Sequence, residues 1–260
     1  LITTTPKNVP LLRRLLESPD LVVTRGRTEE NADNLSPDFA AKMRALYGHS
    51  ALARQELDGE MLGDVEGSLW PRTLLDACRL KTSEGATPPA PETFTRVVVA
   101  VDPPAGSKGD ACGIIAAACD DQGRAFVLAD GSVKRPRPDQ WASAAVALAE
   151  AYGADAIIAE ANQGGDMVRE VLQASGATLP VHLVHASRGK TARAEPVAAL
   201  YQAGRVFHCG VFAGLEDELN GMQSGGGFAG QSRSPDRADA LVWAITALLL
   251  GRRGEPRVRG

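Results

Sequence analysis

The sequence predicts an α/β fold in which a mixed β-sheet is covered by helices on both faces. Three strand-like runs follow one another between residues 96 and 130, joined by short polar turns. After them, apolar helices and short strands alternate as far as residue 250. Strands joined by short turns pair antiparallel, whereas strands separated by a helix are typical of parallel pairing. The order of elements therefore predicts three antiparallel strands followed by parallel ones.

The three leading strands are expected at Arg96–Asp102, Ala111–Cys119 and Arg124–Asp130. All three are rich in small or β-branched apolar residues and are bounded by turn residues. Cys112 and Cys119 lie within the second run. The four cysteines form no CxxC pair and show no zinc spacing, so we expect these two to be small buried side chains.

The rest of the fold alternates between the helical and the strand pattern. Ala156–Glu160 is almost continuously apolar, which is typical of a strand buried on both faces. Trp141 and Trp243 stand in apolar helical stretches and are expected in the core. The helices are expected at Pro138–Tyr152, Gly165–Ala174, Thr191–Ala203 and Asp236–Leu250, and the remaining strands at Val181–His185 and Arg205–His208.

A proline- and glycine-rich stretch at residues 81–94 predicts a linker. It separates a polar, helix-rich segment at residues 1–80 from the α/β domain at residues 95–253, and residues 254–260 form a tail. The first segment has few large apolar groups, so we do not expect it to fold well alone. Within it, helices are expected at Leu11–Glu17 and Pro37–Tyr47, and a strand at Leu21–Thr24.

Composition limits the classes of partner. The formal net charge is −4, so a nucleic-acid partner would have to meet a local basic strip rather than a basic molecule. No run approaches the roughly 18 apolar residues of a membrane span, and no signal peptide is visible. We expect a cytoplasmic protein without a membrane partner and, because the chain begins with Leu1 rather than Met, a fragment.

Carboxylates stand where apolar elements end. Asp102 follows five apolar residues and precedes Pro103 and Pro104, which cannot continue a central strand. Glu160 ends an apolar strand, where a carboxylate is costly unless it meets water, a partner or a metal. A turn-forming role is the alternative for Asp102. Carboxylates at two strand tips and on a late helix predict a site for two divalent cations, which clamp the attacking and leaving oxygens of a phosphodiester.

Further polar residues extend this candidate site. Asp236 and Asp239 lie three apart at a helix start; capping is the alternative for Asp236, and Asp239 is the better ligand because an apolar run follows it. Asp110 begins the second strand and is either a ligand or a solvated turn residue. Asn162 either orients a ligand or caps a helix. Three basic residues at one helix start either contact phosphate or form an exposed basic turn: Arg188, Lys190 and Arg193.

Five sequence blocks, in this order and approximate spacing, resemble those of one group of nucleases. They are Val97–Pro104, Gly109–Ile114, Ala159–Val168, Lys190–Pro196 and Ser234–Asp239. The arrangement resembles ribonuclease H-like nucleases, and in particular the large terminase subunit of tailed phages and gene-transfer particles. In that family a packaging ATPase precedes the nuclease domain. The segment Asp236–Ala244 is also similar to the acidic helix of Holliday-junction resolvases.

The first part of the chain resembles the end of the ATPase domain in the same family. Leu1–Pro6 resembles its coupling motif, and Thr24–Leu35 with Arg54–Leu57 resembles the end of that domain. The resemblance therefore implies that residues 1–80 are its C-terminal part. No GxxxxGK[ST] sequence occurs, so the triphosphate cradle is absent and ATP hydrolysis by this chain is not expected.

The resemblance implies a ribonuclease H-like nuclease that cuts concatemeric double-stranded DNA during genome packaging into a phage-like capsid, in the cytoplasm of a bacterial host. Its partners would be DNA, the portal protein and the small terminase subunit. Its cofactors would be two Mg²⁺ or Mn²⁺ ions. By this implication the catalytic residues are Asp102, Glu160 and Asp239, with Asp236 or Asp110 as further ligands, and the DNA-binding residues are Lys190, Arg193, Arg188 and Asn162.

Two other classes of function are weighed against this one. An actin-like or sugar-kinase ATPase also begins with an acidic first strand, but it needs a glycine-rich phosphate loop there, whereas Asp102 is followed by two prolines. The second is a non-catalytic module that docks on a portal or small terminase subunit. The retained carboxylates argue against it, and a metal-binding titration would separate the two.

Overall fold

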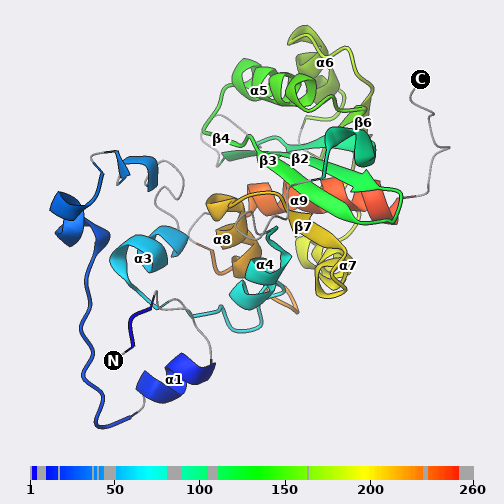
Figure 1. Ribbon diagram of the computed structural model, residues 1–260. Coiled ribbons are helices and arrows are strands. Elements are labelled where there is room, and N and C mark those ends of the chain that lie inside the picture. The colour runs from blue at the N-terminus through cyan, green and yellow to red at the C-terminus, as the bar shows by residue number, and fades with distance from the viewer. Residues whose placement is uncertain are drawn as a thin grey trace.

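The computed structural model describes residues 2–4, 10–16, 18–36, 38–39, 41–43, 51–61, 63–80, 89–104, 111–162, 164–230 and 234–251. In this part of the chain a twisted sheet with helices on both faces forms the body of the molecule (Figure 1). None of the helices described combines the length and the apolar character needed to cross a membrane.

The sheet has the predicted mixed topology. β1, β2 and β3 are consecutive antiparallel strands, β5 lies parallel beside β1, β6 lies parallel beside β5, and β7 lies parallel beside β3. The spatial order is β6-β5-β1-β2-β3-β7, and the short β4 pairs with β2. The strands are β1 (Phe94–Asp102), β2 (Ala111–Asp120), β3 (Ala125–Asp130), β4 (Val133–Lys134), β5 (Ala156–Glu160), β6 (Val181–Val184) and β7 (Val206–His208).

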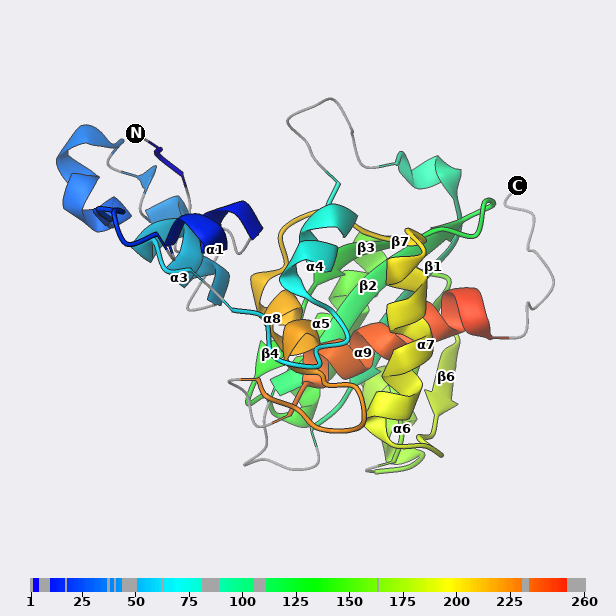
Figure 2. The same ribbon diagram turned by 90° about the horizontal axis from the view of Figure 1, so that it is seen from below.

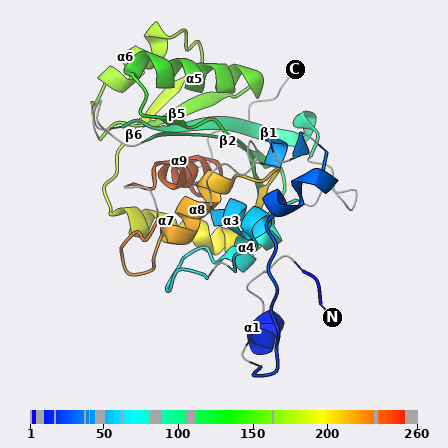
Figure 3. The same ribbon diagram turned by 90° about the vertical axis from the view of Figure 1, so that its left-hand side faces the viewer.

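Successive side chains of a strand point to opposite faces, and both faces of this sheet are apolar. Val98 and Ala100 of β1 belong to one buried cluster, whereas Val97, Val99 and Val101 belong to the other. Figure 3 shows α5 and α6 on one face and α4, α7, α8 and α9 on the other. These helices are α4 (Arg72–Cys78), α5 (Pro138–Ala151), α6 (Met167–Ala174), α7 (Lys190–Gln202), α8 (Ala213–Gly221) and α9 (Asp236–Ile245), which continues as the wider turn η4 (Thr246–Leu250).

The strands and helices expected after residue 95 are therefore confirmed, and Cys112, Cys119 and Trp141 are buried as predicted. α8 was not predicted, although its Leu215 and Leu219 show helical spacing and are both fully buried.

The N-terminal elements lie apart from the sheet (Figure 1). They are α1 (Pro10–Leu16), η1 (Thr28–Asn34) and α3 (Ala51–Asp58). The strand expected at Leu21–Thr24 is wrong: the backbone there pairs with no described strand, and Val22 is 87% exposed. Of the helix expected at Pro37–Tyr47, residues 39 and 41–43 are helical, and residues 37, 40 and 44–47 lie outside the described residues.

Residues 68–80, which come before the expected linker, pack on the sheet. Trp70, Leu75 and Cys78 are buried in the same cluster as Val98 of β1. The short helix η3 (Pro91–Thr93) leads directly into β1, and residues 81–88 of the expected linker are outside the described part of the chain, as is the tail at 254–260. α4 and the preceding Trp70 are therefore structural parts of the sheet domain.

Candidate functional site

Two predicted carboxylates emerge at the same edge of the sheet. β1 and β5 are parallel neighbours with Val101 opposite Ala159, so the residues that follow, Asp102 and Glu160, end adjacent strands side by side. Asp102 is partly buried, and so is Glu160. The carboxyl ends of parallel strands are a common location for ligand sites in α/β folds.

Gly113 brings the acidic end of α9 to the same edge. It lies opposite Asp102 on β2, and a Cβ atom at this position would lie 1.9 Å from the carbonyl oxygen of Asp236. Any side chain would therefore push the helix away from the sheet. Because glycine allows this close approach, α9 begins directly against β2 at the position opposite Asp102, and Asp236 and Asp239 are both buried there.

The four carboxylates influence one another electrostatically. Burial raises the pKa of Asp102 well above its usual value, and the negative charges of Asp239, Glu160 and Asp236 raise it further, while Lys190 opposes them. Burial also raises the pKa of Asp239, against the lowering effect of Lys190 and Arg193. An accumulation of negative charge in a partly dehydrated place favours bound cations.

Two cationic side chains of α7 form salt bridges with two of the four carboxylates, Glu160 and Asp239. Lys190 Nζ lies 2.5 Å from Asp239 Oδ2 and donates a hydrogen bond to Ser234 Oγ at 3.0 Å. The first contact is a close salt bridge, and it lowers the pKa of Asp239 against the effect of burial. Arg193 bridges two acids, with Nη1 3.3 Å from Glu160 Oε2 and Nη2 3.4 Å from Asp239 Oδ1.

Trp243 belongs to the site, although it was predicted as a core residue. Its indole Nε1 donates to Glu160 Oε2 at 2.5 Å, and the Arg193 guanidinium lies 4.7 Å from the ring centroid. The physical reason is helical spacing: Trp243 is four residues after Asp239 on α9, so the two share one face of the helix. That spacing was the available signal in the sequence.

Asn162 holds the other oxygen of Glu160. Its Nδ2 donates to Glu160 Oε1 at 2.9 Å, and its own Oδ1 accepts from the backbone N–H of Ala186 at 2.9 Å. Asn162 therefore connects the end of β5 to the segment that leads into α7. Arg188, in that segment, is exposed. Asp110 lies outside the described residues.

The donor set fits divalent cations in kind. Asp102, Glu160 and Asp239 offer carboxylate oxygens, which are the ligands that Mg²⁺ and Mn²⁺ prefer. As the side chains stand, no three acidic, histidine or cysteine residues in the described ranges are gathered closely enough to hold an ion. Lys190 and Arg193 supply the positive charge among these oxygens instead. Binding of a cation would require these two side chains to move off Asp239 and Glu160.

Comparison with protein families gives one match. The family described as "Terminase RNaseH-like domain" matches residues 99–248, which is more than half of the chain and includes all four of these carboxylates. No relative is found among curated proteins.

Solved structures of the same fold include nuclease domains of phage proteins. The nuclease domain of the large terminase subunit gp2 of bacterial virus Sf6 is 17% identical, with a TM-score of 0.51 over 68% of this chain and 98% of that chain. The P22 large terminase nuclease domain is 12% identical, with a TM-score of 0.52 over 71% and 92%. The large terminase nuclease of thermophilic phage G20c with bound magnesium is 20% identical, with a TM-score of 0.50 over 70% and 98%. At this identity the likeness establishes the ribonuclease H-like fold.

Proposed function

The chain belongs to the terminase ribonuclease H-like domain family, and on that premise we propose that it is a metal-dependent endonuclease that cuts double-stranded DNA during genome packaging. The observation that carries the proposal is the meeting of Asp102, Glu160 and Asp239 at one edge of the sheet, from two strands and a helix. The three residues are far apart in sequence, and all lie within the matched range.

In this proposal Asp102, Glu160 and Asp239 hold two Mg²⁺ or Mn²⁺ ions, with Asp236 beside them and Asp110 as a further candidate. The G20c nuclease of the same fold has been crystallised with magnesium. When bound, such ions lower the pKa of an attacking water and stabilise the leaving 3′ oxygen. Trp243 and Asn162 donate to the two oxygens of Glu160 and so fix the direction in which this carboxylate presents its free lone pairs.

The basic residues divide into two roles. The Lys190 side chain is 48% exposed, so its ammonium is open to a DNA phosphate once a metal ion replaces it beside Asp239. Arg188 is exposed in the segment that leads into α7, and Asn162 accepts a hydrogen bond from Ala186 of the same segment. Arg193 was predicted to contact DNA, but its side chain is only 10% exposed. We therefore assign Arg193 to bracing Glu160 and Asp239.

The wider setting of the reaction follows the family. We propose that the substrate is concatemeric DNA in the cytoplasm of a bacterial host, and that the partners in packaging are a portal protein and a small terminase subunit. We also propose that residues 1–80 derive from the packaging ATPase, although the chain carries no phosphate-binding GxxxxGK[ST] loop and should not hydrolyse ATP alone.

Cleavage of supercoiled plasmid tests the proposal. We expect nicking in Mn²⁺ or Mg²⁺, none in EDTA, and none with Asp102→Asn or Asp239→Asn, because an amide is a poorer ligand and carries no charge. Asp139→Asn is the matched control: Asp139 lies on α5, on the opposite face of the sheet, with its side chain 64% exposed. This control should cleave like the unaltered chain. Metal-dependent nicking that persists in Asp102→Asn would overturn the assignment.

A further inference from the structure

Three consecutive carboxylates on α8 connect this helix to two others: Glu216 and Asp217 bind the two ends of α4, and Glu218 binds the start of α9. Successive helical residues point about 100° apart, so Glu216, Asp217 and Glu218 face in different directions. Glu216 is 1% exposed and Glu218 is 4% exposed. Acidic side chains are rarely buried so completely unless they are paired, so each has a structural task.

Glu218 holds the first turn of α9. Its Oε2 accepts hydrogen bonds from the backbone N–H groups of Arg237 at 2.7 Å and Ala238 at 3.2 Å, and its Oε1 accepts from Arg237 Nη1 at 2.8 Å. The first N–H groups of a helix have no partner within the helix, and a carboxylate is favoured there by the helix dipole. Pro235, which precedes α9, provides no side-chain cap. The cap therefore comes from another helix.

The residues that Glu218 binds lie between the proposed metal ligands. Arg237 and Ala238 separate Asp236 from Asp239 in the sequence. The Arg237 side chain also reaches Asp130 at the end of β3, with Nε 3.1 Å from Oδ2. Together with the close approach at Gly113, these contacts fix the acidic turn of α9 relative to α8 and to the sheet.

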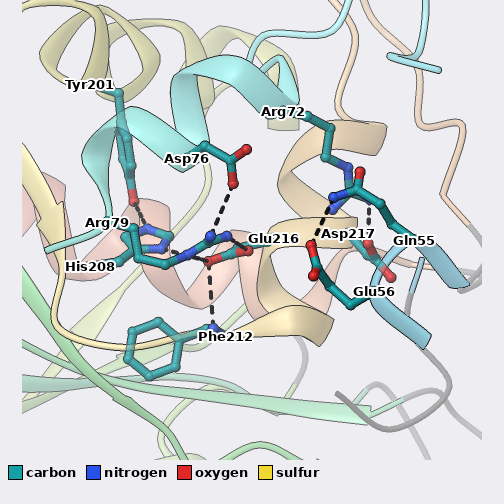
Figure 4. Close-up of polar contacts among 10 residues, drawn as sticks. All are labelled: Gln55, Glu56, Arg72, Asp76, Arg79, Tyr201, His208, Phe212, Glu216 and Asp217. Carbon is teal, nitrogen blue, oxygen red and sulfur yellow. Dashed lines mark hydrogen bonds and ion pairs between the residues drawn. The ribbon is translucent and has the colours of Figure 1, made fainter. Parts of the chain in front are cut away.

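The other two carboxylates face α4 rather than the site. Glu216 binds Arg79, with Nη2 2.6 Å from Oε2, and its Oε1 lies 3.2 Å from His208 Nδ1. Asp217 pairs with Arg72 (Figure 4). Glu216 is thus as buried as Glu218 and lies on the same helix, but its partners among the described residues are Arg79, His208 and Phe212, none of them on α9. It serves as a matched comparison for Glu218.

We propose that Glu218 is a positioning residue for cleavage: by capping α9 between Asp236 and Asp239, it sets where these carboxylates present their oxygens. This inference rests on the proposed nuclease function. A misplacement of about 1 Å at a reacting centre lowers rates by about 100-fold. An amide at this position can accept at one oxygen only, and its NH₂ group would face the N–H donors of the helix start.

The test compares Glu218→Gln, Glu218→Asp and Glu216→Gln in the full chain, at a temperature where each variant is folded by circular dichroism. For Glu218→Gln we expect kcat for Mn²⁺-dependent nicking to fall about 100-fold with KM for DNA nearly unchanged, because the exposed basic residues are untouched. Glu218→Asp keeps the carboxylate and should recover part of the loss. Glu216→Gln should lose stability but keep its kcat.

Mn²⁺ binding, measured by calorimetry without DNA, is the second readout. We expect Glu218→Gln to weaken it and Glu216→Gln to leave it unchanged. Equal kcat and Mn²⁺ affinity in Glu218→Gln and Glu216→Gln would show that Glu218 only stabilises the fold, and would overturn the inference. If the unaltered chain binds Mn²⁺ but does not nick DNA, the nuclease proposal fails, and the binding comparison still decides the role of Glu218.

Discussion

At the scale of single residues, the candidate site is predictable where a polar group interrupts an apolar pattern. Asp102 and Glu160 each end an apolar strand, and Asp239 stands before an apolar helical run; the structure brings all three together. Trp243 gave no such signal, because a tryptophan in an apolar helix is usually a core residue. Only its spacing of four residues from Asp239 distinguishes it from a core tryptophan, and this spacing is informative only after Asp239 has been assigned to the site.

Trp243→Phe tests the contact between the indole and Glu160. The substitution keeps an aromatic ring beside Arg193 but removes the N–H that Glu160 Oε2 accepts. A hydrogen bond to a charged group contributes about 1.5–3 kcal/mol, so we expect kcat for nicking to fall about 10- to 100-fold. Trp141→Phe, in the core of the opposite face, should lower the thermal midpoint and leave kcat unchanged. A Trp243→Phe variant with full activity would remove the indole from the site.

At the scale of elements, long periodic segments were predictable and short ones were not. Apolar periodicity predicts α5, α7 and α9, and a continuous apolar run predicts β5. α8 spans nine residues and is flanked by glycine-rich sequence, so its two leucines were not enough to predict a helix. The strand expected at Leu21–Thr24 failed for the opposite reason. Its residues have strand propensity, but within the described part of the chain no strand lies beside them to complete their backbone hydrogen bonds.

The attachment of α4 to α8 should depend on pH through Glu216. Burial alone would raise the pKa of Glu216, but the hydrogen bond and charge of His208 and the charge of Arg79 lower it from 4.5 to about 2. Because the folded-state pKa is below the unfolded-state value, this stabilisation is complete above about pH 4.5 and is lost as the pH falls toward 2.

Urea unfolding of the unaltered chain and Glu216→Gln measures this contribution. Removing one partner of a buried ion pair costs about 3–5 kcal/mol, so we expect a difference of that order in the free energy of unfolding at pH 7. The difference should shrink steadily below pH 4.5, because the unfolded chain then binds a proton at Glu216 that the folded chain does not bind until about pH 2. Asp139→Asn, in an exposed pair, should change little at any pH. A difference that stays constant down to pH 3 would contradict this account.

At the scale of the whole molecule, the periodicity changes after residue 95 sufficed to predict the mixed sheet and its two helical layers. The net charge was less informative about a nucleic-acid partner. It is −4 for the whole chain, although three basic residues lie together at the start of α7: Arg188, Lys190 and Arg193. The limits of the sheet domain were harder to see, because Trp70 and Leu75 reach its core from a segment that precedes the proline-rich stretch. Figure 2 shows α4 beside α7 and α8, in the helical layer that covers one face of the sheet.

Two truncated chains test where the domain begins. A chain of residues 51–251 keeps α3, α4 and Trp70, and we expect it to unfold in urea at nearly the same midpoint as the full chain. A chain of residues 89–251 lacks Trp70, Leu75 and Cys78, which are 0%, 1% and 4% exposed. Loss of a buried tryptophan alone costs about 3–5 kcal/mol, so this chain should be largely unfolded or aggregated in water. Equal midpoints for the two would place the boundary near residue 90 instead.

The adjacency of Glu216, Asp217 and Glu218 has a mechanical consequence. The rise from the first to the last of these residues along the α8 axis is about 3 Å, less than one helical turn. The contacts of α8 with α4 and its contacts with the acidic turn of α9 are therefore made from the same turn of one helix, without a loop between them. A displacement of α4 relative to the sheet is therefore passed to the first turn of α9 through less than one turn of helix.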